Sequence, residues 1–248
     1  MRRLRSILIA AAVLAAPAFF GALLATERSA NLTGVPISQE KHHHLVLENS
    51  FVQVYEVEIA AHEATLLHQH VHDYASITLG ECDLTDAVVG KLETRVRSAD
   101  TDTAVSLNRG MFSHKITNHA DTPFRSIDVE LQRAQGEINR VSHLVNQELL
   151  DGNADSAGMV TLAESEEVRL AATGVAPGAS WSPARDERDR LVVMIDKIYD
   201  TAGPKEHNSP FPAGMLAWVP AGKSWSVANS SAHPMRLVVL EFKGSSPR

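Results

Sequence analysis

The sequence predicts an all-β fold made of two similar halves. The apolar runs have the length of strands, turn-forming residues separate them, and a set of framework residues repeats at a fixed distance. Runs rich in β-branched residues and bounded by Gly, Pro, Asn and Asp indicate β-strands rather than helices. The runs on which this prediction rests are 52–59, 74–79, 127–131, 191–195 and 237–242.

The repeat defines the two halves. Four residues recur 111 positions later, and Ala61-His62 aligns with Pro177-Gly178 at an offset of 116. A duplicated module of about a hundred residues favours two closed or sandwiched antiparallel barrels, with a pair of immunoglobulin-like sandwiches as the alternative. The recurring pairs are Asn118 and Asn229, Pro123 and Pro234, Arg125 and Arg236, and Glu130 and Glu241.

One segment between the halves has a different pattern. Apolar residues from Ile138 to Leu149 recur at helical spacing, so we expect a helix within about 133–150. The predicted organisation is a first domain at 40–132, a short helical linker at 133–155 and a second domain at 156–245.

The first thirty residues have the composition of an export signal. Arg2, Arg3 and Arg5 precede an apolar run from Ile7 to Ala25. A basic start followed by an apolar stretch is typical of a secretory signal peptide. Ala16-Pro17-Ala18 fits a cleavage site, but the run of 19 residues is nearly long enough to remain as a membrane anchor. We expect an exported protein, periplasmic or extracellular, whose only membrane contact is this segment if it is retained in the inner membrane.

Charge and cysteine content narrow the choice of partners. Without residues 1–30 the chain keeps 19 basic and 29 acidic residues, a net charge of −10. Such a surface repels polyanions, so we expect no nucleic-acid partner. Cys82 is the only cysteine, so the chain forms no internal disulfide.

The histidines of the first half suggest a metal site. In His68-Gln69-His70 the two imidazoles lie on one side of a strand, because alternate residues share a face. His114, four residues before Asn118, supplies a third imidazole from another strand. Inside a barrel such a set suits one divalent transition metal ion, whether iron, manganese, nickel, copper or zinc.

These residues resemble the two motifs of the cupin superfamily. In that family five residues separate a Gly from His-x-His, a Glu and a second Gly follow, and a later motif ends in His-x-x-x-Asn. Here His62 stands at the place of the first Gly, and Asp73 stands seven residues before Gly80, where the family has its Glu. The gap after His70 is shorter than usual, and Gly110 is displaced by one residue. His72 shares strand parity with His68 and His70, so Asp73 and His72 both remain candidates for a fourth ligand.

The second half resembles a cupin domain that has lost its ligands. Pro220-Ala221-Gly222 and Asn229 match the second motif, but Trp225 stands in place of its histidine. Ala184 and Asp186 stand where the other two histidines belong. The resemblance therefore implies a bicupin, two double-stranded β-helix (jelly-roll) barrels in tandem. Its second barrel binds no metal, and its interior is filled or forms an apolar cavity.

Other polar residues are interpreted as structural. We interpret His42, His43 and His44 as a solvated strand start, although they could reach the site. Arg125 is assigned a structural role because Arg236 repeats it, and Tyr74 is assigned to packing.

The resemblance implies a metal-dependent dioxygenase acting on a small organic molecule. The alternatives are a non-catalytic protein that binds metal or a small ligand, and an isomerase or hydrolase that uses zinc or manganese. A general base for the last class could be Glu63 or Asp128 by residue type. Cupin proteins often pair their barrels, so a homodimer is also expected.

Overall fold

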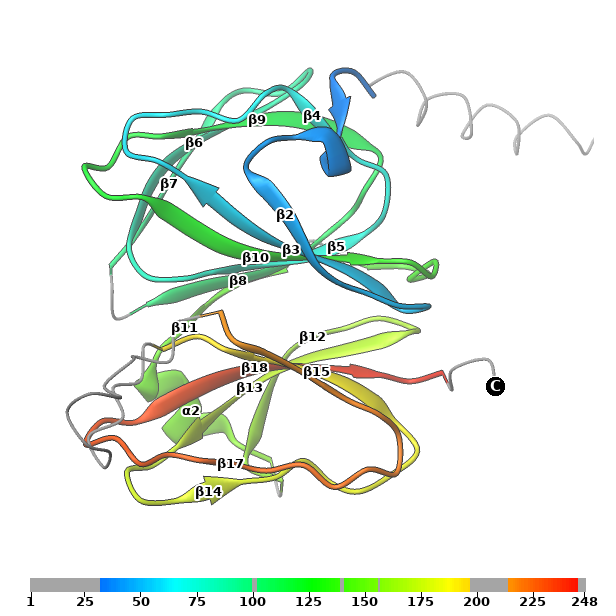
Figure 1. The fold of residues 1–248 in the computed structure, drawn as a ribbon, viewed down its shortest axis with the longest axis vertical. Coiled ribbons are helices and arrows are strands. Elements are labelled where there is room, and N and C mark those ends of the chain that lie inside the picture. The colour runs from blue at the N-terminus through cyan, green and yellow to red at the C-terminus, as the bar shows by residue number, and fades with distance from the viewer. Residues whose placement is uncertain (1–31, 100–101, 139–140, 156, 197–213, 245–248) are drawn as a thin grey trace, which may run out of the picture. The chain divides into compact units, whose positions relative to one another are not determined.

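The computed structural model describes residues 32–99, 102–138, 141–155, 157–196 and 214–244. These residues belong to one compact unit, Asn31–Arg248. Strands dominate it, as the sequence predicts (Figure 1). The predicted signal or anchor segment, 1–30, lies outside the described residues. None of the described helices has the length and apolar character needed to cross a membrane.

The first half contains two sheets that together enclose the histidines. One sheet has the strand order β1-β4-β9-β6-β7 and the other the order β11-β8-β5-β10-β3-β2. A short 3-10 helix, η1 (Ile37–Gln39), joins the first two strands. The strands are β1 (Val35–Pro36), β2 (His43–Glu48), β3 (Val52–Ile59), β4 (His68–His70), β5 (Tyr74–Thr78), β6 (Cys82–Val88), β7 (Thr94–Ser98), β8 (Thr103–Asn108), β9 (Phe112–Asn118), β10 (Phe124–Leu131) and β11 (Val141–Val145).

The second half repeats the second of these sheets. Its main sheet has the order β12-β13-β18-β15-β16, and β14 and β17 form a separate pair. This order is that of β2-β3-β10-β5-β8, strand for strand. The elements are α2 (Gln147–Asn153), β12 (Met159–Glu164), β13 (Val168–Val175), β14 (Ser180–Trp181), β15 (Asp189–Met194), β16 (Leu216–Val219), β17 (Val227–Ala228) and β18 (Met235–Phe242).

The repeat extends to individual pairings. Ser76 pairs with Asp128 between β5 and β10, and Val192 pairs with Val239 between β15 and β18. Ser76 and Val192 are 116 residues apart, and Asp128 and Val239 are 111 residues apart. These are the two offsets found in the sequence. Equivalent positions of the two halves can therefore be compared residue by residue.

The repeated asparagines have the same structural role. The Asn118 side chain donates to the carbonyls of Ile59 and Thr122. Asn229 donates in the same way to Val175 and His233. Since each amide ties two chain segments of its half together with buried hydrogen bonds, these residues stabilise the framework rather than a ligand.

Two left-handed backbone positions are also repeated. His62 has a φ of 61°, and its counterpart Gly178 has a φ of 74°. Met111 also has a φ of 61°, and its counterpart Gly222 has a φ of 70°. The framework requires this conformation at both positions, although it strains side chains other than glycine.

The segment at 133–150 differs from the sequence prediction. Residues Val141–Val145 form β11, which pairs antiparallel with β8, and the helix found among the described residues here is Gln147–Asn153. Leu144 is half exposed while Val145 is buried, which is the alternation of a strand. Over so few residues the apolar spacing fits both the helical and the strand period. The segment forms a strand because it can pair with the edge of β8.

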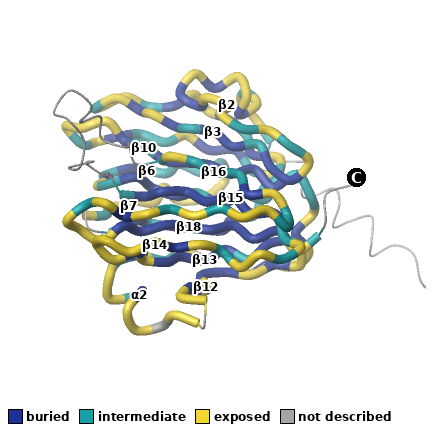
Figure 2. Tube along the Cα trace, turned by 60° about the horizontal axis from the view of Figure 1, so that its bottom comes forward, coloured by how far each residue is buried: buried dark blue, intermediate teal, exposed yellow. Residues whose placement is uncertain are grey.

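The halves share one core. A single cluster of buried apolar side chains contains β3, β5, β8 and β10 residues of the first half and β12, β13, β15 and β18 residues of the second. β18, at the centre of the main sheet of the second half, is buried along its whole length (Figure 2). A second cluster, made by β13, β15, β18 and the Trp181 region, lies wholly within the second half.

Candidate metal centre

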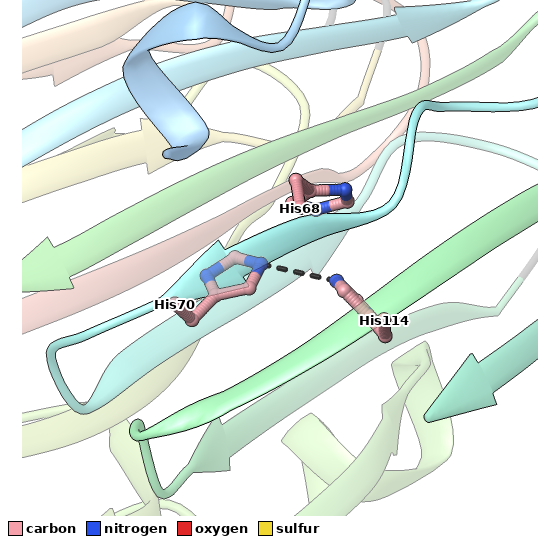
Figure 3. A group of neighbouring side chains, drawn as sticks. All are labelled: His68, His70 and His114. Carbon is pink, nitrogen blue, oxygen red and sulfur yellow. Dashed lines mark hydrogen bonds between the residues drawn. The ribbon is translucent and has the colours of Figure 1, made fainter. Parts of the chain in front are cut away.

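Two neighbouring strands bring the three predicted imidazoles together. His68 and His70 lie on β4, and His114 lies on β9, where it is the register partner of His68 (Figure 3). All three are buried, with exposed fractions of 0%, 0% and 6%. One nitrogen from each ring lies within 4.8 Å of the other two, which is close enough for a single metal ion.

The other nitrogen of each ring is held from behind. Nδ1 of His68 donates to the Leu66 carbonyl at 2.9 Å, and Nδ1 of His114 donates to Asp86 at 2.8 Å. Nδ1 of His70 lies 2.6 Å from Glu130 Oε1. Metal-binding histidines are commonly fixed in this way by a carboxylate or a carbonyl, which leaves Nε2 for the ion.

The nitrogens that converge carry lone pairs, and the described residues do not satisfy all of them. Nε2 of His68 is buried and has no hydrogen-bond partner among the described residues. Nε2 of His70 and Nε2 of His114 lie 3.0 Å apart, so a proton or a cation must lie between them. A buried unsatisfied nitrogen is costly, and a metal ion would satisfy all three. The residues therefore fit a metal.

Burial favours the neutral form of His68 and His70, as metal binding requires. Burial, together with the neighbouring His114 and His43, lowers the pKa of His68 from 6.5 to about 3. Burial and the same neighbours hold the pKa of His70 well below its ordinary value. Burial, assisted by the charge of Asp128, raises the pKa of Glu130 from 4.5 to about 9. Neutral imidazole is the form that binds transition metals.

Aromatic rings fix the orientation of His70. Tyr74 stacks on one side of the imidazole with ring centroids 4.3 Å apart, and Phe112 stacks at 5.3 Å. Tyr74, for which we preferred a packing role over a place in the pocket wall, also lines the cavity beside the site. A ring packed in this way loses little freedom when it binds an ion.

The two candidates for a fourth ligand are placed elsewhere. The Asp73 carboxylate accepts a hydrogen bond from the Gly110 backbone N–H and forms an ion pair with Arg109. His72 is only partly buried, and its carbonyl packs against Gly110 so closely that a side chain there would overlap it. Neither residue belongs to the group whose ligand atoms converge. Among the described residues, the ligand atoms that converge are those of His68, His70 and His114.

A further histidine reaches the site from β2. We expected His42, His43 and His44 to be solvated; this expectation is wrong for the first two, which are buried, and right for His44. The ring of His43 lies 4.7 Å from that of His68. The buried carboxylate of Glu40 binds Nδ1 of both His42 and His43, which explains why they turn inward. Period-2 alternation alone could not reveal this acid.

A cavity of about 150 Å³ lies beside the site, inside the first half. His43, His68 and His114 form part of its wall, and hydroxyl groups and Asp128 of the six-stranded sheet form another part. Three protein ligands leave coordination positions free on a transition metal. A small molecule in this cavity would therefore lie beside both the ion and the protein groups that face it.

In the second half, the positions equivalent to the three histidines hold residues with other roles. Trp225 packs against the apolar cluster there, while Asp186 forms ion pairs with Arg188 and Arg190. Among the described residues, the group of His68, His70 and His114 is the one cluster of metal-binding side chains found.

Comparisons with known proteins identify the fold. A scan against protein-family models gives no match, and neither does a search of curated proteins. Among solved structures, AerE from Microcystis aeruginosa matches with a TM-score of 0.52 and 14% identity over 82% of this chain and 97% of its own. A glyoxylate-induced protein from Pseudomonas aeruginosa matches with 0.55 and 12% over 83% and 82%.

An enzyme is among the matching structures. Salicylate 1,2-dioxygenase from Pseudoaminobacter salicylatoxidans, in adducts with gentisate, matches with a TM-score of 0.53 and 11% identity over 77% of this chain and 68% of its own. Identities this low establish the architecture and leave the activity open. The described part of this chain, with its paired sheets and buried histidine triad, has the cupin fold.

Proposed function

We propose that the protein is an exported, metal-dependent oxygenase of the dioxygenase type that acts on a small organic molecule. The observation that carries the proposal is the convergence of three buried imidazoles, two of which line a cavity of about 150 Å³. When bound there, a redox-active metal would supply open coordination positions for a substrate oxygen and for dioxygen.

The protein residues have distinct roles in this proposal. His68, His70 and His114 hold the ion, and Asp86 and Glu130 orient two of the rings through Nδ1. Tyr74 and Phe112 keep the His70 ring in place. The apolar side of the cavity, which includes Ile59 and Phe124, excludes water from the bound molecule.

Two finer features belong to the same proposal. The repeated strand order, registers and asparagine contacts support two barrels in tandem, of which only the first holds a metal. Export is supported by the basic and apolar start of the chain, 1–30. The similarity to a salicylate dioxygenase supports oxygen chemistry as the class of reaction.

Metal content is the first test. The protein is purified without chelator, and its metals are measured by elemental analysis beside a His68→Ala/His70→Ala variant. We expect about one equivalent of iron, manganese, copper or nickel, lost in the double variant because two of three ligands are gone. His119→Ala removes an exposed histidine that contacts Thr85 and is the matched control.

Oxygen uptake with small phenols then separates the functions. Uptake that depends on the metal supports the oxygenase. Zinc as the only stoichiometric metal, without uptake after iron reconstitution, would instead favour a binding protein or a hydrolytic enzyme. If neither the native nor the reconstituted protein contains metal, the site assignment itself is wrong.

A further inference from the structure

One wall of the cavity carries a row of polar side chains on three adjacent strands. Ser76 on β5 is the register partner of Asp128 on β10 and of Ser106 on β8, and Ser126 lies two residues from Asp128 on the same face. All four line the cavity. Alternate residues of neighbouring strands form such a row only when they face the same side.

Asp128 accepts hydrogen bonds from two of the serines in this row. Its Oδ1 accepts hydrogen bonds from Ser76 Oγ at 2.7 Å and from Ser126 Oγ at 3.3 Å. Its Oδ2 lies 3.9 Å from Nε2 of His43. The side chain is 10% exposed and lines the cavity, so Asp128 is a largely buried carboxylate in the cavity wall. A buried carboxylate of this kind favours a ligand that brings a hydrogen-bond donor.

The described wall of the cavity has no lysine or arginine to pair with an acid. Among the described residues that line it, none is lysine or arginine, while Asp86 and Asp128 contribute two carboxylates. Two negative charges already match the two positive charges of a divalent ion. A further anion would therefore enter a buried site without an uncompensated cation to pair with.

The second half shows that the fold does not need these polar groups. The positions equivalent to Ser76 and Asp128 are Val192 and Val239, which pair with each other in the same register. The positions equivalent to Ser106 and Ser126 are Ala217 and Leu237. All four belong to the apolar cluster of that half, which leaves a cavity of only about 40 Å³.

The same framework folds around apolar residues in the second half, so the fold itself does not require the polar row of the first half. A ligand in the cavity would explain why polar groups stand there. The size of the cavity limits that ligand, since about 150 Å³ is enough for a single benzene-sized ring. An acid of the same size would place its carboxylate either against Asp128 or on the metal ion, where an uncharged ligand would otherwise bind.

We propose that Asp128, positioned by Ser76 and Ser126, selects a small, non-acidic ligand that donates a hydrogen bond from a hydroxyl or amino group, and disfavours carboxylates. The inference rests on the metal site of the proposed function but does not require oxygen chemistry. Asp128 is here a specificity-determining residue that contacts the ligand.

The test uses two probes of the same shape. Salicylamide and salicylate differ in one group, an amide NH2 against a carboxylate oxygen. Their affinities for the zinc-loaded protein are measured by isothermal titration calorimetry, so that no turnover interferes. We expect salicylamide to bind at least about tenfold more tightly than salicylate, because the amide adds a hydrogen-bond donor for Asp128 whereas the carboxylate adds a negative charge beside it.

Asp128→Asn removes the charge with little change of shape. We expect the preference for salicylamide to fall at least about fivefold in this variant. Asp121→Asn removes a charge from an exposed carboxylate that pairs with His62, and it should leave the preference unchanged. Zinc content is measured in every sample, so that loss of the ion is not mistaken for loss of selectivity.

Three results would overturn the inference. Equal or tighter binding of salicylate by the unaltered protein is one, and binding of neither probe is another. An unchanged preference in a folded, zinc-loaded Asp128→Asn is the third. Selective binding without any oxygen uptake by the iron-loaded protein would uphold the inference and reject the proposed oxygenase.

Discussion

Asp86 on β6 lies behind His114 and accepts the hydrogen of its Nδ1. This contact fixes which nitrogen of the ring faces the ion and increases the basicity of that nitrogen. Outer partners of this kind are worth about 10–100-fold in metal affinity. The sequence did not identify Asp86, because no spacing rule links it to His114.

We therefore expect Asp86→Asn to bind metal about 10–100-fold more weakly than the unaltered protein while keeping its fold. Competition with a coloured chelator measures this affinity. Asp83→Asn, on the same strand but paired with the surface residues Arg95 and Arg97, is the control and should bind normally. Equal affinities in all three proteins would show that Asp86 does not orient the ligand.

Asp186 provides a second test at the scale of a residue. Burial raises its pKa, but hydrogen bonds from Arg188 and Arg190 outweigh burial and lower the pKa from 3.8 to about 2. The folded state thus favours the ionised carboxylate. Its stabilising contribution is complete above pH 3.8 and is lost as the pH falls toward 2.

Asp186→Asn should accordingly be less stable than the unaltered protein at neutral pH, and the difference should shrink as the pH falls from about 4 to about 2. Thermal unfolding at a series of pH values measures it. A difference that stays constant through this range would mean that the carboxylate gains nothing from its arginine partners.

At the scale of elements, β11 corrects the predicted helix and gives a clear prediction. The exposed fraction of Val145 is 0% and that of its neighbour Leu144 is 51%. Val145→Asp would bury an unpaired charge, so we expect it to lower the free energy of unfolding by about 3 kcal/mol or more. Leu144→Asp should change it by less than about 0.5 kcal/mol.

Chemical denaturation of the two variants measures both values. Equal effects would argue against the strand and its pairing with β8. The sequence failed at this element because the helical and the strand period coincide over five residues. The open edge of a neighbouring strand, which only the fold shows, resolved the ambiguity.

The repeat is the element-scale feature that the sequence predicted best. Asn118 and Asn229 hold the same turns, and the offsets of 116 and 111 reappear in every equivalent pairing between the two main sheets. His62 and Met111 take the left-handed conformation of their glycine counterparts. The backbone thus preserves positions at which the first-half sequence departs from the cupin motifs.

For the whole molecule, the shared core determines how the protein unfolds. Phe51 of the first half packs against Trp218 and Phe242 of the second, with ring centroids 5.8 and 4.9 Å apart. Because one apolar cluster contains both halves, neither half can unfold without exposing the core of the other.

We expect Phe51→Ala to cost about 3–5 kcal/mol, as large-to-small changes in a core do. We also expect the unaltered protein to unfold in a single calorimetric transition. Phe112→Leu, which alters an aromatic contact inside the first half only, is the comparison variant. Two separated transitions in the unaltered protein would show that the halves are independent.

The sequence by itself determined the all-β class, the duplication and the three imidazoles, because each depends on spacing along one strand or on a repeat along the chain. Tertiary structure alone decided the rest. It turned Asp73 toward Gly110, brought His43 beside His68, and placed Asp86 and Asp128 at the cavity. These contacts join strands far apart in sequence, and the local periodicity of a chain carries no information about which distant strand its side chains will meet.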